Sequence, residues 1–122
     1  MLRLSLLALV VAACGGSTAA AIDTPAQQST LVEVSCTSIA PTATVMTNDA
    51  TMSYADSPAT INMGQVVQFT TSANHNVTAN TTGSDPKLNV DFATTKCFMF
   101  TSTGTFGFHC SVHGFTGSVT VQ

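Results

Sequence analysis

Three side chains in the second half of the sequence could hold a metal ion. Cys110 and His113 form a Cys-x-x-His pair, and a loop with two intervening residues can turn both side chains toward one point. His75 lies far upstream, but distant segments of a β-sheet fold are often neighbours in space. Two imidazoles and one thiolate make the trigonal donor set that a blue copper ion prefers. These three residues therefore predict a copper site.

The residues before Cys110 indicate a strand that positions it. They read Thr-Phe-Gly-Phe-His, and successive side chains of a strand point to opposite faces. We therefore expect Cys110 to point inward and His109 to be a structural or surface residue. Four aromatic residues at the same period are expected in the core: Phe98, Phe100, Phe106 and Phe108.

The rest of the sequence favours an all-β fold. Only 7% of the residues are charged, and the many Thr and Val residues fit a pleated sheet better than a helix. Strands are expected within residues 43–47, 60–70, 97–101, 105–110 and 118–121. Turn-forming residues separate them at the spacing of a β-sandwich or barrel. The stretch 85–93 has no clear period, and we expect an excursion there with one short helical turn.

The cysteine count requires an explanation for each thiol. Four cysteines are present, and if Cys14 carries lipid, an odd number remains. We expect a disulfide between Cys36 and Cys97, worth on the order of 4 kcal/mol, with Cys110 kept as a thiolate. The competing pair, Cys97 with Cys110, would leave Cys36 without a partner.

The N-terminus is expected to be a targeting segment. Residues 1–13 combine Arg3 with a short apolar stretch, as in a signal peptide, and are too short to span a bilayer. The sequence Val-Ala-Ala-Cys ending at Cys14 resembles the lipobox of bacterial lipoproteins; ordinary secretion without lipid is the alternative. We expect Cys14 to anchor the protein in the bacterial cell envelope, at the outer membrane or cell surface, facing either the periplasm or the outside. A flexible linker over 14–33 would then precede a copper-binding domain over 34–122.

The sequence around the three donor residues resembles the cupredoxins, particularly plastocyanin, pseudoazurin and amicyanin. His75 is followed by Asn-Val, and the run from Gly104 to His113 is similar to the ligand loop of that family. The resemblance implies a Greek-key β-sandwich with one type 1 copper at one end, held by His75, Cys110 and His113. Met is absent from the position where the family places an axial ligand. Weak axial contacts are expected from Thr116 or from the Asn74 carbonyl, and loss of the thioether should favour Cu(I).

The resemblance implies a one-electron carrier. We expect no enzyme activity, because the sequence has no second ligand set, no spare His cluster and no paired carboxylates for acid–base chemistry. We expect redox partner proteins to dock near His113, with Phe115 either beside that surface or in the core. The net charge of −3 and the scarcity of basic residues argue against nucleic-acid binding, and the scattered acidic residues are expected to be a solvated surface. The protein is expected to be monomeric. The alternatives are a copper module for storage, delivery or sensing, a zinc site, or a metal-free adhesion domain.

Overall fold

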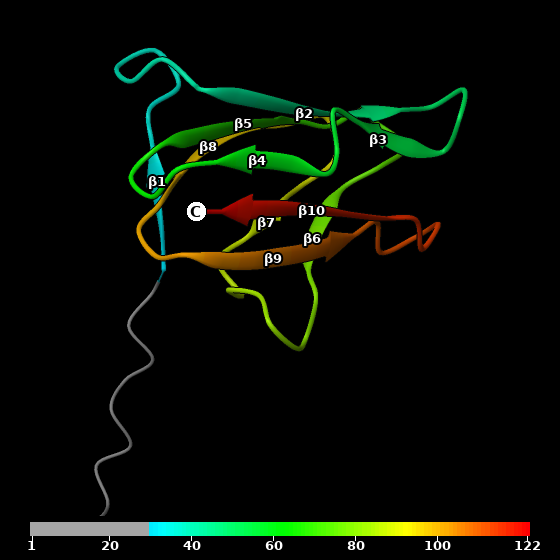
Figure 1. Cartoon of the computed structure of the whole chain (residues 1–122). Coiled ribbons are helices and arrows are strands. Elements are labelled where there is room, and N and C mark those ends of the chain that lie inside the picture. The colour runs from blue at the N-terminus through cyan, green and yellow to red at the C-terminus, as the bar shows by residue number, and fades with distance from the viewer. Residues whose placement is uncertain (1–29) are drawn as a thin grey trace, which may run out of the picture.

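The computed structural model describes residues 30–122, which form a sandwich of two five-stranded sheets (Figure 1). The predictions for the targeting segment, Cys14 and most of the linker lie outside the described residues. The strands are β1 (Leu31–Val34), β2 (Ala43–Asn48), β3 (Ser53–Ala55), β4 (Ala59–Ile61), β5 (Val66–Thr70), β6 (Val77–Ala79), β7 (Asn89–Val90), β8 (Thr95–Phe100), β9 (Gly104–His109) and β10 (Thr116–Val121).

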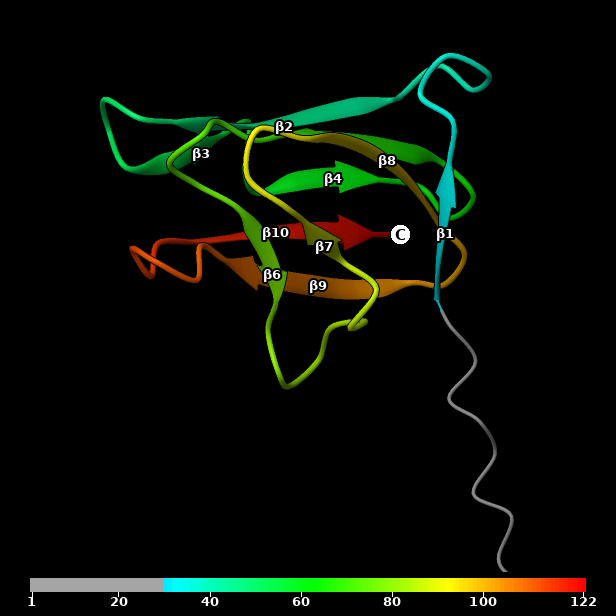
Figure 2. The ribbon, with the colours of Figure 1, turned by 180° about the vertical axis from the view of Figure 1, so that it is seen from behind.

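The strand order confirms the predicted all-β Greek-key sandwich. One sheet has the order β1-β8-β5-β2-β3 and the other β4-β10-β9-β6-β7. The chain crosses from one sheet to the other after β3, β4, β5, β7 and β8, so consecutive strands often lie in different layers. The view from behind shows β6 and β7 beside β9 at the margin of the second sheet (Figure 2). Residues 30–122 contain no helix long and apolar enough to cross a membrane.

The core lies between the two sheets and is built from residues at period two. Phe98, Phe100, Phe106 and Phe108 are all buried, as the alternation predicted. Fully burying one such ring stabilises the fold by about 2 kcal/mol. Gly117 is needed beside this core because a side chain there would meet the ring of its cross-strand partner Phe108.

One boundary and one predicted element differ from the sequence predictions. Residues 31–33, which we assigned to the linker, belong to β1, because Leu31 is fully buried and the strand pairs with β8. The expected helical turn within 85–93 is wrong: Leu88 N–H donates to the Asp85 carbonyl at 2.9 Å in a tight turn, and β7 follows. The stretch 85–93 is too short for its pattern of polar and apolar residues to distinguish a turn followed by a two-residue strand from a helical turn.

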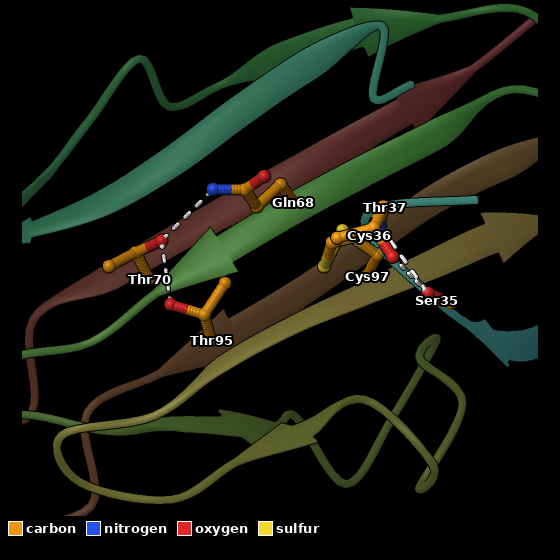
Figure 3. Close-up of a disulfide and its surroundings, with 7 residues drawn as sticks. All are labelled: Ser35, Cys36, Thr37, Gln68, Thr70, Thr95 and Cys97. Carbon is orange, nitrogen blue, oxygen red and sulfur yellow. Dashed lines mark hydrogen bonds between the residues drawn. A yellow bond between two sulfur atoms is a disulfide. The ribbon is translucent and has the colours of Figure 1, made fainter. Parts of the chain in front are cut away.

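The disulfide joins Cys36, just after β1, to Cys97 in β8, as predicted (Figure 3). Cys110 is consequently free and buried, and the alternative pairing of Cys97 with Cys110 is wrong. The bridge lies at the outer face of its sheet, on the side where Gln68, Thr70 and Thr95 form a row of hydrogen-bonded side chains (Figure 3). It therefore fastens the β1–β2 loop over that sheet.

Candidate metal centre

Cys110 is held at the end of β9 by a tight loop. The alternation along β9 continues through Cys110, whose side chain is fully buried. Its N–H donates to the Phe115 carbonyl at 2.9 Å, and its carbonyl accepts from Gly114 N–H at 2.8 Å. Gly114 has a φ of +73°, a conformation that glycine adopts without strain. These contacts fold residues 110–115 back on themselves and bring His113 next to Cys110.

His75 approaches the same point from the β5–β6 loop. Its Nδ1 lies 3.1 Å from His113 Nδ1 and 3.8 Å from Cys110 Sγ, while His113 Nδ1 lies 3.9 Å from the same sulfur. The loops that carry these residues lie at one end of the sandwich, where the β2–β3 hairpin also turns (Figures 1 and 2). The structure thus brings together all three donors that the sequence singled out.

The three donor atoms fit a single metal ion. For bonds of about 2.0 Å to nitrogen and about 2.3 Å to sulfur, a trigonal arrangement places the donors roughly 3.5 to 3.8 Å apart. The observed separations of 3.1, 3.8 and 3.9 Å are close to these values. Within residues 30–122, His75, Cys110 and His113 form the one cluster of three or more His, Cys, Asp or Glu side chains that could hold a metal ion. Two imidazoles and a thiolate suit copper, whereas zinc normally takes a fourth ligand.

The environment of Cys110 favours the thiolate, which is the form that binds metal. Burial acts to raise the pKa of the Cys110 thiol, but hydrogen bonds from the backbone of Asn76, His113 and Val112, and from the His113 side chain, lower it to about 6. The sulfur is therefore ionised at neutral pH even though solvent does not reach it.

The two imidazoles differ in their access to solvent. His75 is 1% exposed, and the ring of Phe115 packs edge-on against it with centroids 4.9 Å apart. His113 is exposed at the surface of the protein. Phe115 is half-buried and also contacts Tyr54, so it packs against the core and covers His75. Of the three donor residues, only His113 is therefore exposed to solvent.

Three polar residues support the donors, and the sequence analysis did not identify them. Asn76 hydrogen-bonds Ser111, which ties the loop of His75 to the loop of Cys110. Asp49 lies 3.3 Å from His75 Nε2, so its assignment to a solvated surface was incomplete. Hydrogen bonds from Ser72 and Asn74 hold the pKa of Asp49 below its usual value. The Asn-His-Asn sequence was a signal for Asn76, but no local pattern links Asp49 to His75.

The remaining predictions around the site have different outcomes. His109 lies outside the donor group, half-buried, with its Nδ1 2.9 Å from Asn80 Oδ1, which confirms a structural role. Thr116 is an exposed residue at the start of β10, and the Asn74 side chain donates to Asp49. The Thr116 and Asn74 carbonyl contacts to a metal stay predictions.

Comparison with solved structures identifies the class of fold as that of the cupredoxins. Amicyanin from Paracoccus versutus is 20% identical, covers 78% of this chain and 100% of its own, and superposes with a TM-score of 0.57. An oxidised methionine-to-leucine mutant of amicyanin is 22% identical over 76% of this chain and 99% of its own, with a TM-score of 0.58. The reduced Cu(I) form of a proline-to-glycine mutant of amicyanin is 22% identical over 75% of this chain and 92% of its own, with a TM-score of 0.55.

Sequence comparison gives no such match. No model of a known protein family matches the chain, and no curated protein sequence does so. The solved structures compared above are amicyanins, and at 20 to 22% identity this likeness concerns the fold alone.

Proposed function

We propose that this protein is an extracytoplasmic type 1 copper protein that carries single electrons. One observation carries the proposal: two imidazole nitrogens and a buried thiolate converge on one point at the end of a β-sandwich. His75, Cys110 and His113 would hold the ion. Copper bound there would accept and release one electron, and its ligand set suits both oxidation states. The likeness to amicyanin structures, which include oxidised and Cu(I) forms, supports this reading.

The residues of the site have separate roles in this proposal. Cys110 and His75 bind from the buried side, where packing and hydrogen bonds keep them from moving between oxidation states. A site that does not rearrange costs little energy when the electron arrives or leaves. His113 reaches the surface, and its ring edge is the short route to a partner protein. The neighbouring Val112 is 62% exposed and gives that route an apolar rim.

Carrier activity accounts for the site better than catalysis does. Metal-centred catalysis needs an open coordination position with a substrate pocket. Here, Phe115 packs edge-on against the buried ring of His75 and covers that side of the site. We therefore propose a non-enzymatic, monomeric protein whose redox partner docks at His113. The lipid anchor at Cys14 and a place in the bacterial cell envelope also belong to this proposal.

Reversible redox cycling tests the proposal against storage or delivery of copper. Copper-loaded protein should take up one electron per chain, keep its metal, and return to the original spectrum on reoxidation over several cycles. Electron self-exchange, measured by NMR line broadening in mixtures of the two forms, should be fast. Zinc-loaded protein serves as the inert control. Release of the metal on reduction would favour the storage or delivery alternative.

Anchoring at Cys14 has its own test. Full-length protein expressed in bacteria should partition with membranes and carry acyl chains on Cys14 by mass spectrometry. Cys14→Ser should be soluble or unprocessed. Recovery of the unmodified chain from the soluble periplasmic fraction would contradict the anchor and leave the copper proposal unaffected.

A further inference from the structure

The β2–β3 turn places a carboxylate behind the buried imidazole of His75. Asp49 directly follows β2, at the same end of the sandwich as the three metal donors (Figure 1). Its Oδ1 lies 3.3 Å from His75 Nε2, the ring nitrogen that faces away from Cys110 and His113. The His75 side chain is 2% exposed and that of Asp49 is 48% exposed. This contact therefore reaches the buried ring from the solvent side.

The carboxylate is fixed in place by the same loop that carries His75. Ser72 Oγ donates to Asp49 Oδ1 at 2.5 Å, and Asn74 Nδ2 donates to Oδ2 at 3.0 Å. The turn around Asp49 is itself ordered, because Asn48 Oδ1 accepts from the backbone N–H groups of residues 50 and 51. Both carboxylate oxygens thus have partners, and their position follows the loop of His75.

Such a fixed acceptor selects one tautomer of the ring. A neutral imidazole carries its proton on one nitrogen, and the hydrogen bond made by that nitrogen decides which one it is. A carboxylate at Nε2 keeps the proton there, so Nδ1 presents its lone pair toward His113 Nδ1, which lies 3.1 Å away. Nδ1 is the atom that faces Cys110 Sγ at 3.8 Å. An ordinary exposed ion pair would contribute little to stability, so the significance of this contact lies in the buried ring that it orients.

We propose that Asp49 is a positioning residue for His75, which fixes the ring as the Nε2–H tautomer and makes Nδ1 a stronger donor to Cu(II). The predicted effect on the reduction potential rests on the proposed copper function, whereas the predicted tautomer of His75 does not. Residues that contact a metal ligand without binding the metal themselves typically matter for metal affinity, which falls 10- to 100-fold when such a residue is mutated. Negative charge at Nε2 stabilises the more highly charged ion, so Asp49 lowers the reduction potential.

The test uses Asp49→Ala and Asp49→Glu, with Asp91→Asn as the matched control. Asp91 is an exposed carboxylate in the β7–β8 loop at the same end of the sandwich, so its loss removes a similar charge without touching His75. The first readout is the His75 tautomer in metal-free protein, from imidazole ¹⁵N chemical shifts at mildly alkaline pH. The second readout is the reduction potential of the copper-loaded proteins.

The expected results separate this proposal from the copper function. Wild type and Asp91→Asn should show the Nε2–H tautomer, whereas Asp49→Ala should show a mixture and Asp49→Glu should restore the wild-type pattern. Loss of the carboxylate should favour Cu(I) over Cu(II) by about tenfold, which is about 59 mV for a one-electron couple. An unchanged tautomer in Asp49→Ala, or a potential equal to that of Asp91→Asn, would overturn the proposal. If no variant gave a thiolate–copper spectrum, the copper function would fail and the tautomer result would still decide the role of Asp49.

Discussion

Asn76 and Ser111 are 35 positions apart in the sequence, and their side chains join the two loops that carry the metal donors. Ser111 N–H donates to Asn76 Oδ1 at 2.9 Å, and the Ser111 hydroxyl lies 2.9 Å from Asn76 Nδ2 and 3.1 Å from Oδ1. Each residue directly follows a donor, His75 in one loop and Cys110 in the other. The distance between these two donors is thus set by a side-chain hydrogen-bond network as well as by the sheets.

Asn76→Ala should weaken both the fold and the metal site. Asn76 is buried, and its removal deletes several hydrogen bonds at once, for which we expect a loss of about 2 kcal/mol in the free energy of unfolding. Metal affinity should fall roughly tenfold because the two loops can then move apart. Urea unfolding of metal-free protein and a copper competition titration measure the two effects.

Asn80→Ala is the matched control for that substitution. Asn80 is half-buried and contacts His109, outside the donor group. We expect Asn80→Ala to lower stability by about 1 kcal/mol while leaving copper affinity unchanged. Equal losses of copper affinity in both variants would contradict the role of Asn76 as a link between the two ligand loops.

The unequal exposure of the imidazoles predicts unequal rescue by free imidazole. His113→Gly should lose the thiolate–copper absorption and regain it when imidazole is added, because the vacated position opens to solvent. His75→Gly should not be restored at the same concentration, because His75 is 1% exposed and covered by Phe115. Titration by visible absorbance measures the rescue, and far-ultraviolet circular dichroism checks that both variants are folded. Equal rescue would show that the two positions have similar access.

The disulfide should contribute to stability without contributing to the site. Cys36 and Cys97 close a loop with a sequence separation of 61 residues. The loop-entropy model gives about 4 kcal/mol for a loop of this length. The double variant Cys36→Ala/Cys97→Ala should therefore have a much lower urea midpoint but, where folded, an unchanged copper spectrum. A changed spectrum would mean that the bridge positions the donors.

The lowered pKa of Cys110 makes the stability of the metal-free protein depend on pH. The pKa of Cys110 is about 6 in the folded protein, whereas an unfolded thiol has a pKa of about 8.5. Between these values the unfolded state binds more protons, so stability rises with pH, by at most about 1.4 kcal/mol per pH unit. As the pH falls below about 6, this contribution disappears.

Urea unfolding of metal-free protein at several pH values, compared with Cys110→Ala, isolates that contribution. The difference between the two proteins should grow in favour of the parent as the pH rises through the window. Absorbance of the thiolate in the ultraviolet provides an independent titration. A constant difference across the window would show that the folded and unfolded thiols titrate alike.

The sequence was sufficient for the features that depend on local pattern. The Cys-x-x-His spacing predicted two donors, and the alternation before Cys110 predicted that its side chain points inward. The cysteine count favoured the disulfide of Cys36 with Cys97, since the alternative left a thiol unexplained. The β-branched composition and the absence of helical periodicity predicted an all-β sandwich. In each case the physical signal lies within a few residues or in the composition.

Features that depend on contacts between distant segments were beyond the sequence. Asp49 and His75 meet because β2 and β5 are parallel neighbours, and the spacing of residues along the sequence does not predict this pairing. Ser111 looked like an ordinary loop residue until its loop was placed beside Asn76. The strand β1 was not predicted, because the burial of Leu31 depends on its pairing with β8. Short strands and side-chain networks of this kind produce no repeating pattern of polar and apolar residues in the sequence.

The spectrum of the copper-loaded protein tests the central claim most directly. If His75, Cys110 and His113 hold the ion, the purified domain should bind one Cu(II) with an intense visible band from thiolate-to-copper charge transfer. Its electron spin resonance should show a small copper hyperfine splitting, because the unpaired electron is shared with sulfur. Cys110→Ser should remain folded and lose both features. Only weak absorption from the parent protein, or the same spectrum in parent and Cys110→Ser, would contradict the account.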